Sequence, residues 1–478
     1  MTSNELLIFE KGNGKANKNF IPKMDIEGID IDEIIPPIYQ RAQLSIPDTP
    51  EIEIVRHYIN LSQKNYGVDN GIYPLGSCTM KYNPKVNEIT ARLSGFSQIH
   101  PLQEENQGAM EVIYETSKML EEITGMEGFT LQPAAGAHGE LTGLLIMKKY
   151  FKSKKVKKSK IIVPDSAHGT NPASAKMAGF SIIELQSDKN GEVPLDQLEY
   201  AMKEKDVAGI MLTNPNTLGV FDRQIKEITR IVHKNGGLCY YDGANLNPML
   251  GICRPKDMGF DIVHLNLHKT FSTPHGGGGP GSGPVGVVND LIPFLPKPCI
   301  IKTSEGIICK SNNEKSIGRI KAFWGNFGVI IRAYTYILAL GSEGLEQVGQ
   351  ISVLNANYLR VLLQKKYDLP YNRICQHEFV LSDKGLPNEV ITEDIAKRIL
   401  DYGIYAPTIY FPLIVNGALM IEPTETESKN SLDNFVDIMY KIYEEAHDDP
   451  ELVKKAPYNT SIGRLDAVLA ARKPILHD

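Results

Sequence analysis

The chain has 478 residues, which at about 150 residues per domain predicts two or three domains and excludes a single small binding module. Hydrophobic residues make up 42% and charged residues 23%, a globular composition that excludes a disordered or collagen-like chain. The net charge is −6, and the six cysteines are scattered without CxxC or zinc-ligand spacing. We therefore expect no nucleic-acid partner, no metal site and no disulfide framework.

The N-terminal region has no apolar core behind a basic start, and no stretch approaches about 18 uninterrupted apolar residues. These features predict a cytoplasmic protein with neither a secretory signal nor a membrane span. Residues 1 to about 60 alternate charged and proline-containing pieces, which favours an arm that wraps another surface. The apolar region 328–340 contains Arg332 and is typical of a buried helix.

From about residue 110 to about residue 290, short apolar runs alternate with helix-length segments, which predicts a mostly parallel α/β sheet. The strongest runs are 160–163, 209–213, 237–241 and 261–265. Polar or small residues follow each run. In open α/β sheets the ligand crevice lies beyond the carboxyl ends of the strands, so these residues are candidates for a site.

The last part of the chain has a different pattern. Helical periodicity over 393–402 and 431–445 alternates with strand-like runs at 378–381 and 418–422, which predicts a smaller α+β domain. The expected organisation is therefore an N-terminal arm and active-site loop segment (1–100), a large α/β domain (101–340) and a C-terminal α+β domain (341–478).

The segment 266–283 places Lys269 just past an apolar run and before a glycine-rich loop. A lysine in that position can lose its proton and form a Schiff base, although an ordinary surface lysine beside a flexible loop would look the same. Gly281, Gly283 and Gly286 formally match GxGxxG. We reject a dinucleotide fold, because Pro284 and the β-branched residues after it indicate a loop entering a strand, not a strand opening a helix.

Asp242 also follows an apolar run, 27 residues before Lys269. A carboxylate there would keep a pyridine nitrogen protonated, as pyridoxal phosphate requires, and Ala244 is small enough to lie under the ring. A helix N-cap is the alternative role for Asp242.

The segment 131–143 has small residues before a helical run, so that main-chain N–H groups of Ala135, Gly136 and Ala137 could bind a phosphate; tight packing alone is the alternative. His168 follows a strand on the same edge and could stack on a cofactor ring, unless it is a structural histidine. Asn214 and Thr217 supply polar groups to that edge and could reach the cofactor.

The order of small-residue helix start, histidine, aspartate and lysine resembles fold-type I pyridoxal phosphate enzymes of the aspartate aminotransferase class. Within that class the chain closely resembles the glycine decarboxylases, the P-proteins of the glycine cleavage system. The motifs that carry this resemblance span nearly the whole chain and lie at residues 76–85, 131–140, 241–245, 266–271, 325–328 and 421–428. Trp324 departs mildly from the family pattern, where a tyrosine is expected.

The resemblance implies that Lys269 is the Schiff-base lysine, Asp242 the pyridinium partner and His168 the stacking residue. Phosphate contacts would come from Ala135, Gly136, Ala137, and from His268 or Thr270. It further implies that glycine loses its carboxylate as carbon dioxide and that the aminomethyl group passes to the lipoyl arm of the H-protein. The length matches the second subunit of a split P-protein, which implies a partner subunit 1 of similar fold without the lysine, in an αβ heterodimer or a dimer of heterodimers.

Residues 73–83 are rich in Ser, Thr, Cys and Gly, so Ser77, Cys78 and Thr79 are candidates for a glycine pocket, with an ordinary turn-rich loop as the alternative. His138 and His275 could take part in proton handling. Two other functions stay open: a pyridoxal phosphate decarboxylase or lyase for a larger amino acid, and a non-catalytic subunit that scaffolds an active paralogue. Lys269 argues against the scaffold.

Overall fold

The computed structural model describes residues 6–11, 25–41, 49–100, 103, 106–276, 281–304 and 306–475. The described residues fall into two compact units, Met1–Gly67 and Val68–Asp478. The first unit contains helices α1 (Ile31–Ile34) and α2 (Glu51–Ser62), and several of its isoleucines are exposed, including Ile38 at 83%. Its expected role as a wrapping arm stays a prediction, as do the domain boundaries near residues 100 and 340.

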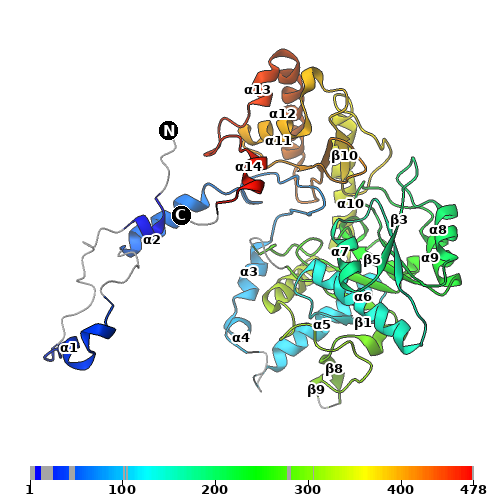
Figure 1. Ribbon diagram of the computed structural model, residues 1–478, viewed down its shortest axis with the longest axis horizontal. Helices are drawn as coiled ribbons and strands as arrows, with labels where there is room; N and C mark the ends of the chain where they lie inside the picture. The colour runs from blue at the N-terminus through cyan, green and yellow to red at the C-terminus, as the bar shows by residue number, and fades with distance from the viewer. Residues whose placement is uncertain are drawn as a thin grey trace. The chain divides into compact units, whose positions relative to one another are not determined.

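A seven-stranded sheet lies at the centre of the second unit (Figure 1). Its strands are β1 (Gly128–Thr130), β2 (Lys160–Pro164), β3 (Ser181–Leu185), β4 (Val207–Thr213), β5 (Leu238–Gly243), β6 (Ile262–Leu265) and β7 (Val285–Val287). The order is β1-β7-β6-β5-β4-β2-β3, and only β7 runs antiparallel to its neighbours. The four strong runs are confirmed as β2, β4, β5 and β6. The strand β7 also confirms that the glycines before it do not open a helix.

Helices cover both faces of this sheet, because the strand side chains that point to either face are mostly apolar. In β5, Tyr240 packs with α6 (Gly136–Ser153) and α7 (Thr170–Met177), whereas Cys239 and Tyr241 pack with the opposite layer. That opposite layer comprises α5 (Gln107–Thr124), α8 (Leu195–Met202), α9 (Ile225–Lys234) and the first half of α10 (Phe327–Leu363). The predicted buried helix at 328–340 is part of α10, which breaks at Gly341 with φ 62°.

The C-terminal part carries a three-stranded antiparallel sheet in the order β10-β12-β11. Its elements are β10 (Phe379–Ser382), α11 (Thr392–Asp401), β11 (Thr408–Ile409), β12 (Ala418–Ile421), α12 (Lys429–Asp448), α13 (Pro450–Lys454) and α14 (Ala467–Arg472). The predicted helices and strands there match α11, α12, β10 and β12. One face of β12 packs on α12 and the end of α10, while Ala418 and Met420 on the other face meet Leu218 and Val220 of the large domain.

Smaller elements complete the second unit: α3 (Lys85–Ala91), α4 (Ser94–Ser97) and the hairpin of β8 (Cys299–Thr303) with β9 (Gly306–Lys310). No helix among the described residues has both the length and the apolar character needed to cross a bilayer. All six cysteines are free thiols, in agreement with the absence of a disulfide framework expected from their spacing.

Candidate active site

The carboxyl ends of the parallel strands bring the predicted residues to one edge of the large sheet. Strand pairing sets Thr213 opposite Asp242 and Asp242 opposite His264, so the ends of β4, β5 and β6 lie at one level. Lys269 lies in the turn that follows β6. The sheet therefore gathers an acid, a histidine and a lysine that are distant in the sequence.

Asp242 is buried, and both of its carboxylate oxygens have partners. Asn171 Nδ2 donates to its Oδ2 at 2.8 Å, the Ala244 N–H donates to its Oδ1 at 2.9 Å, and His264 Nε2 lies 3.2 Å from Oδ1. Asn171 is itself held by Glu140 at 3.1 Å. Burial acts to raise the pKa of Asp242, but the adjacent histidines and the hydrogen bonds outweigh burial and lower it. Asp242 is thus an ionised carboxylate in a fixed orientation.

Lys269 is half-buried, and its main-chain N–H closes a turn by donating to the Asn266 carbonyl at 3.0 Å. Its positive charge acts on the pKa of Cys78, His168 and His268, which come from three different segments. This placement suits a nucleophilic amine.

His168 follows β2 and lies against the loop that contains Ser77. Ser77 Oγ and His168 Nδ1 are 3.2 Å apart, and the imidazole lies parallel to the Phe411 ring at an interplanar angle of 11°. Burial, assisted by the charge of Lys269, lowers the pKa of His168 to about 4. The ring is therefore neutral at pH 7, which suits stacking on an aromatic group.

Helix α6 begins at the segment predicted to bind phosphate. Ala135 is its N-cap residue, and the first N–H groups of a helix, here at Gly136 and Ala137, have no partner within the helix. The glycine-rich loop packs directly on this helix start, since a Cβ on Gly283 would lie 2.1 Å from the Ala135 carbonyl oxygen. Asn326 Nδ2 donates to the Ala134 carbonyl at 3.0 Å and to the Gly281 carbonyl at 2.6 Å, which holds the two segments together. Residues 277–280 of the loop lie outside the described residues.

The residues present fit pyridoxal phosphate. Asp242 offers a negative charge, Ala244 leaves room beside it, and Lys269 offers an amine. The hydroxyls of Thr213 and Thr270 are buried and have no hydrogen-bond partner among the residues that the structure describes. Buried polar groups are normally paired, so these hydroxyls indicate a polar ligand next to Lys269.

Three further histidines line this region. His268 Nδ1 accepts from the Ser282 N–H at 3.3 Å, and its ring meets that of His275 edge-on at 5.0 Å. Burial lowers the pKa of His268 to about 3 and that of His275 to about 4, and burial and Lys321 also lower the pKa of His138. These rings are neutral at pH 7, so each can donate one hydrogen bond and accept another.

Asn214 and Thr217 are buried beside the site, and their polar groups are committed to the protein. Asn214 Oδ1 accepts from the Asp222 N–H at 2.8 Å, and Thr217 Oγ1 donates to the Ser166 carbonyl at 2.8 Å. Both side chains shape the loops after β2 and β4. We therefore interpret them as positioning residues and not as direct cofactor contacts.

The loop 73–83 carries the candidate glycine pocket in a strained conformation. Ser77 and Thr79 have φ values of 64° and 49°, which non-glycine residues seldom adopt. Buried carboxylates stabilise these conformations: Glu378 accepts from the Ser77 N–H at 2.7 Å, and Glu422 accepts from the Thr79 N–H at 2.9 Å. Burial raises the pKa of Cys78, so its thiol stays protonated and is a weak nucleophile.

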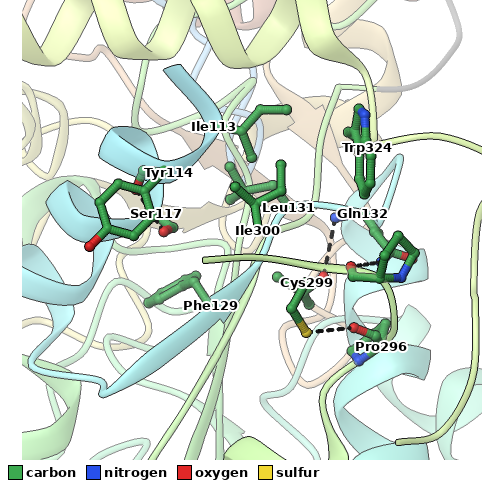
Figure 2. A pocket seen from close by; sticks show the side chains of 12 residues that line it. Ile113, Tyr114, Ser117, Phe129, Leu131, Gln132, Pro296, Cys299, Ile300 and Trp324 are labelled. Carbon is green, nitrogen blue, oxygen red and sulfur yellow. Dashed lines mark hydrogen bonds between the residues drawn. The ribbon is translucent and has the colours of Figure 1, made fainter. Parts of the chain in front are cut away.

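Trp324, the residue that departs from the family pattern, lines a small pocket of about 40 Å³ (Figure 2). In Figure 2 it lies beside Gln132, whose Nε2 donates to the Pro298 carbonyl at 3.0 Å. Leu131 lies on the same wall. The indole thus packs behind the segment that leads into α6.

Sequence reasoning missed several residues that hold the site together: Asn171, His264, Lys81, Glu378 and Glu422. Each had a signal in the sequence, because each is a polar residue next to or within an apolar run or a helix start. A polar residue at such a position must find a partner when it is buried. The partners could not be identified, since they come from segments as far as 344 residues away.

Two sequence families match most of the chain. Residues 14–304 match the sequence family described as glycine cleavage system P-protein, and residues 348–459 match the family described as glycine dehydrogenase, C-terminal domain. A probable glycine dehydrogenase (decarboxylating) subunit 2 from Kosmotoga olearia is 58% identical over 475 residues, covering 98% of both chains.

Two solved structures show the same fold at low sequence identity. An inhibitor-bound glycine decarboxylase (P-protein) aligns with a TM-score of 0.71 and 18% identity, over 86% of this chain and 94% of that one. An aspartate aminotransferase from Thermus thermophilus aligns with a TM-score of 0.57 and 14% identity, over 78% of this chain and 99% of that one. The predicted fold class, fold type I with a large mostly parallel sheet and a smaller C-terminal part, is confirmed.

Proposed function

Because the chain belongs to the glycine cleavage system P-protein family, we propose that it decarboxylates glycine with pyridoxal phosphate and transfers the remaining aminomethyl group to the lipoyl arm of the H-protein, releasing carbon dioxide. The observation that carries this proposal is the set of side chains at one sheet edge, where ionised Asp242 and the half-buried amine of Lys269 follow neighbouring strands. When bound there, pyridoxal phosphate supplies an electron sink for the electron pair that decarboxylation leaves behind.

Several residues of this chain would bind different parts of that cofactor. Lys269 provides the amine for covalent attachment, and Asp242 keeps the ring nitrogen protonated by its charge. His168 stacks on the ring. The phosphate is bound by main-chain N–H groups at the start of α6, together with the Thr270 hydroxyl and with His268.

The substrate pocket is formed by the loop that contains Ser77, Cys78 and Thr79. Two observations favour a substrate without a side chain. The loop is held in place by buried carboxylates, and Thr79 is only 2% exposed. A pocket of fixed size excludes larger amino acids by clashes that a rigid loop cannot relieve.

We further propose two protein partners. One is a paralogous subunit 1 of similar fold that lacks the lysine, in an αβ heterodimer or a dimer of heterodimers, because the relatives are named as a second subunit. The other is the lipoylated H-protein. A cytoplasmic location is proposed on the basis of six free cysteines in a chain of 478 residues.

The test begins with covalent labelling. Purified chain is incubated with pyridoxal phosphate, reduced with borohydride and mapped by peptide mass spectrometry, and the adduct is expected on Lys269. Glycine-dependent exchange of carbon dioxide is then measured with subunit 1 and H-protein present. Lys269→Ala should abolish the exchange, whereas Lys256→Ala, which removes a lysine from a surface ion pair with Glu127, should not.

Two results would replace this proposal. If Lys269→Ala retained activity in the assembled complex, the chain would be a non-catalytic scaffold. If the wild-type complex turned over a larger amino acid but not glycine, the chain would be a different pyridoxal phosphate decarboxylase or lyase.

A further inference from the structure

A buried trio of titratable side chains lies behind the loop 73–83. Glu378 directly precedes β10 and Glu422 directly follows β12, and the pairing of Phe379 with Ile421 puts the two carboxyl groups side by side. His377 completes the group. Its Nε2 lies 3.9 Å from Glu378 Oε1 and 3.8 Å from Glu422 Oε1, and all three side chains are 0% exposed.

Within the described part of the chain, neither ring nitrogen of His377 has a hydrogen-bond partner, although the ring is fully buried. Burial, with the charge of Lys269, lowers the pKa of His377 to about 3. At pH 7 the ring is therefore neutral and provides no positive charge for the two carboxyl groups. An unpaired buried imidazole that faces two acids is costly for stability, which indicates a role in holding or moving a proton.

Two buried carboxyl groups this close cannot both ionise readily, because each negative charge disfavours the other. Burial and the neighbouring acid raise the pKa of Glu378, and burial raises that of Glu422 to about 7. The groups that act on the pair from the surrounding elements are Ser77, Thr79, Asn245, Lys269, His377 and Glu425. Among these, the Lys269 amine brings a positive charge from the cofactor loop.

The reaction proposed above consumes a proton. The bond from the glycine α-carbon to the carboxylate breaks and carbon dioxide leaves; the remaining electron pair forms the carbon–sulfur bond as the lipoyl disulfide breaks. The second sulfur departs with the electron pair of the disulfide bond and must take up one proton to become a thiol. The balance requires an acid near Lys269.

We propose that Glu378 and Glu422 share one proton and supply it, by way of the Lys269 amine, to the sulfur released from the lipoyl disulfide. This role rests on the proposed function, since it needs the disulfide as electron acceptor. Both acids hold the loop 73–83 through the Ser77 and Thr79 N–H groups, and the Cys78 carbonyl of that loop lies 3.1 Å from His275 Nε2 in the segment after Lys269. The proton passes from the carboxyl pair to the amine, and from the amine to the thiolate. The pair then takes up a proton from solvent before the next turnover.

The first test does not depend on activity. Difference infrared spectroscopy of the free chain, in water and in deuterium oxide, should show the carbonyl band of one buried protonated carboxyl group that titrates near pH 7. The double variant Glu378→Gln/Glu422→Gln should lack that band. Absence of the band from the wild-type protein would overturn the proposal, whether or not the variants fold.

The second test uses the assembled complex with H-protein. Glu422→Gln should slow thiol formation in a single turnover by about 100-fold, as expected for the loss of a general acid, and should remove its pH dependence near neutrality. Glu422→Asp should restore part of both. Glu192→Gln, which changes a buried carboxylate paired with Arg373 elsewhere in the fold, is the matched control and should behave as wild type.

The outcomes separate the two proposals. If wild type fails to release carbon dioxide from glycine but shows the infrared band, the proposed function fails and the role of the pair as an acid for the lipoyl sulfur fails with it, although the pair still holds a shared proton. If wild type is active and Glu422→Gln keeps both its rate and its pH profile, the proton pair is wrong and the proposed function stands.

Discussion

The buried ion pair of Lys81 and Glu425 is expected to be essential for stability. Lys81 Nζ donates to Glu425 at 2.8 Å, to Asn247 at 2.8 Å and to Tyr336 at 3.1 Å, and the two charged side chains are 1% and 7% exposed. Lys81→Met removes the cation and leaves the Glu425 carboxylate buried without its counter-charge. Loss of one partner of a buried pair costs about 3–5 kcal/mol.

Urea denaturation of the free chain, followed by circular dichroism, measures this cost as a change in the free energy of unfolding. A control is Lys85 at the start of α3, which pairs with Asp69 at 2.6 Å while both side chains are more than half exposed. Lys85→Met should cost about 0–1 kcal/mol. The double variant Lys81→Met/Glu425→Leu should recover part of the loss, because it removes both buried charges. Equal effects of Lys81→Met and Lys85→Met would refute the assignment of Lys81 as a buried anchor.

Three further outcomes are expected. Gly283→Ala puts a Cβ 2.1 Å from the Ala135 carbonyl and should weaken pyridoxal phosphate binding at least about tenfold by fluorescence titration, while Gly108→Ala, with open space around it, should bind normally. Asp242→Asn should lower carbon dioxide exchange by about 100-fold or more without loss of fold, since the amide cannot balance a protonated ring nitrogen; exchange within twofold of wild type would contradict that role. Because the pKa of Glu422 is raised from 4.5 to about 7, the folded state binds more protons than the unfolded state in that window. Its contribution to stability should fall as pH rises through the window, and the difference in unfolding free energy between wild type and Glu422→Gln should show that slope.

The large sheet was predictable where strands are buried on both faces. Such strands read as continuous apolar runs, and topology alone brings Thr213 at the end of β4, Asp242 at the end of β5 and Lys269 after β6 to one edge of the sheet. The strand β1 is only three residues long, and β3 is an edge strand with exposed positions, so their patterns were too weak to detect. The strand β7 is equally short, but the β-branched residues after Pro284 indicated it.

Contacts between distant segments could not be predicted. Gly76 is glycine because a Cβ there would lie 2.2 Å from Met420 Cγ, a contact made across more than 300 residues of sequence. The roles of Glu378 and Glu422 likewise depend on antiparallel pairing in the small sheet, which no local pattern specifies. Local periodicity identifies elements, whereas register and partner choice are set by tertiary packing.

The buried acids are better explained by function than by stability. Replacing paired buried charges with apolar residues of similar volume is often neutral or stabilising, so two carboxyl groups at the ends of β10 and β12 are an expensive way to close a small sheet. Their oxygens nevertheless hold Ser77 and Thr79 at positive φ, next to His168 and the segment that contains Lys269. The C-terminal sheet thus fixes the shape of the substrate pocket and keeps a proton beside it. A substitution that kept the fold but removed the acids would separate these two contributions, and that is the comparison that Glu422→Gln and Glu422→Asp make.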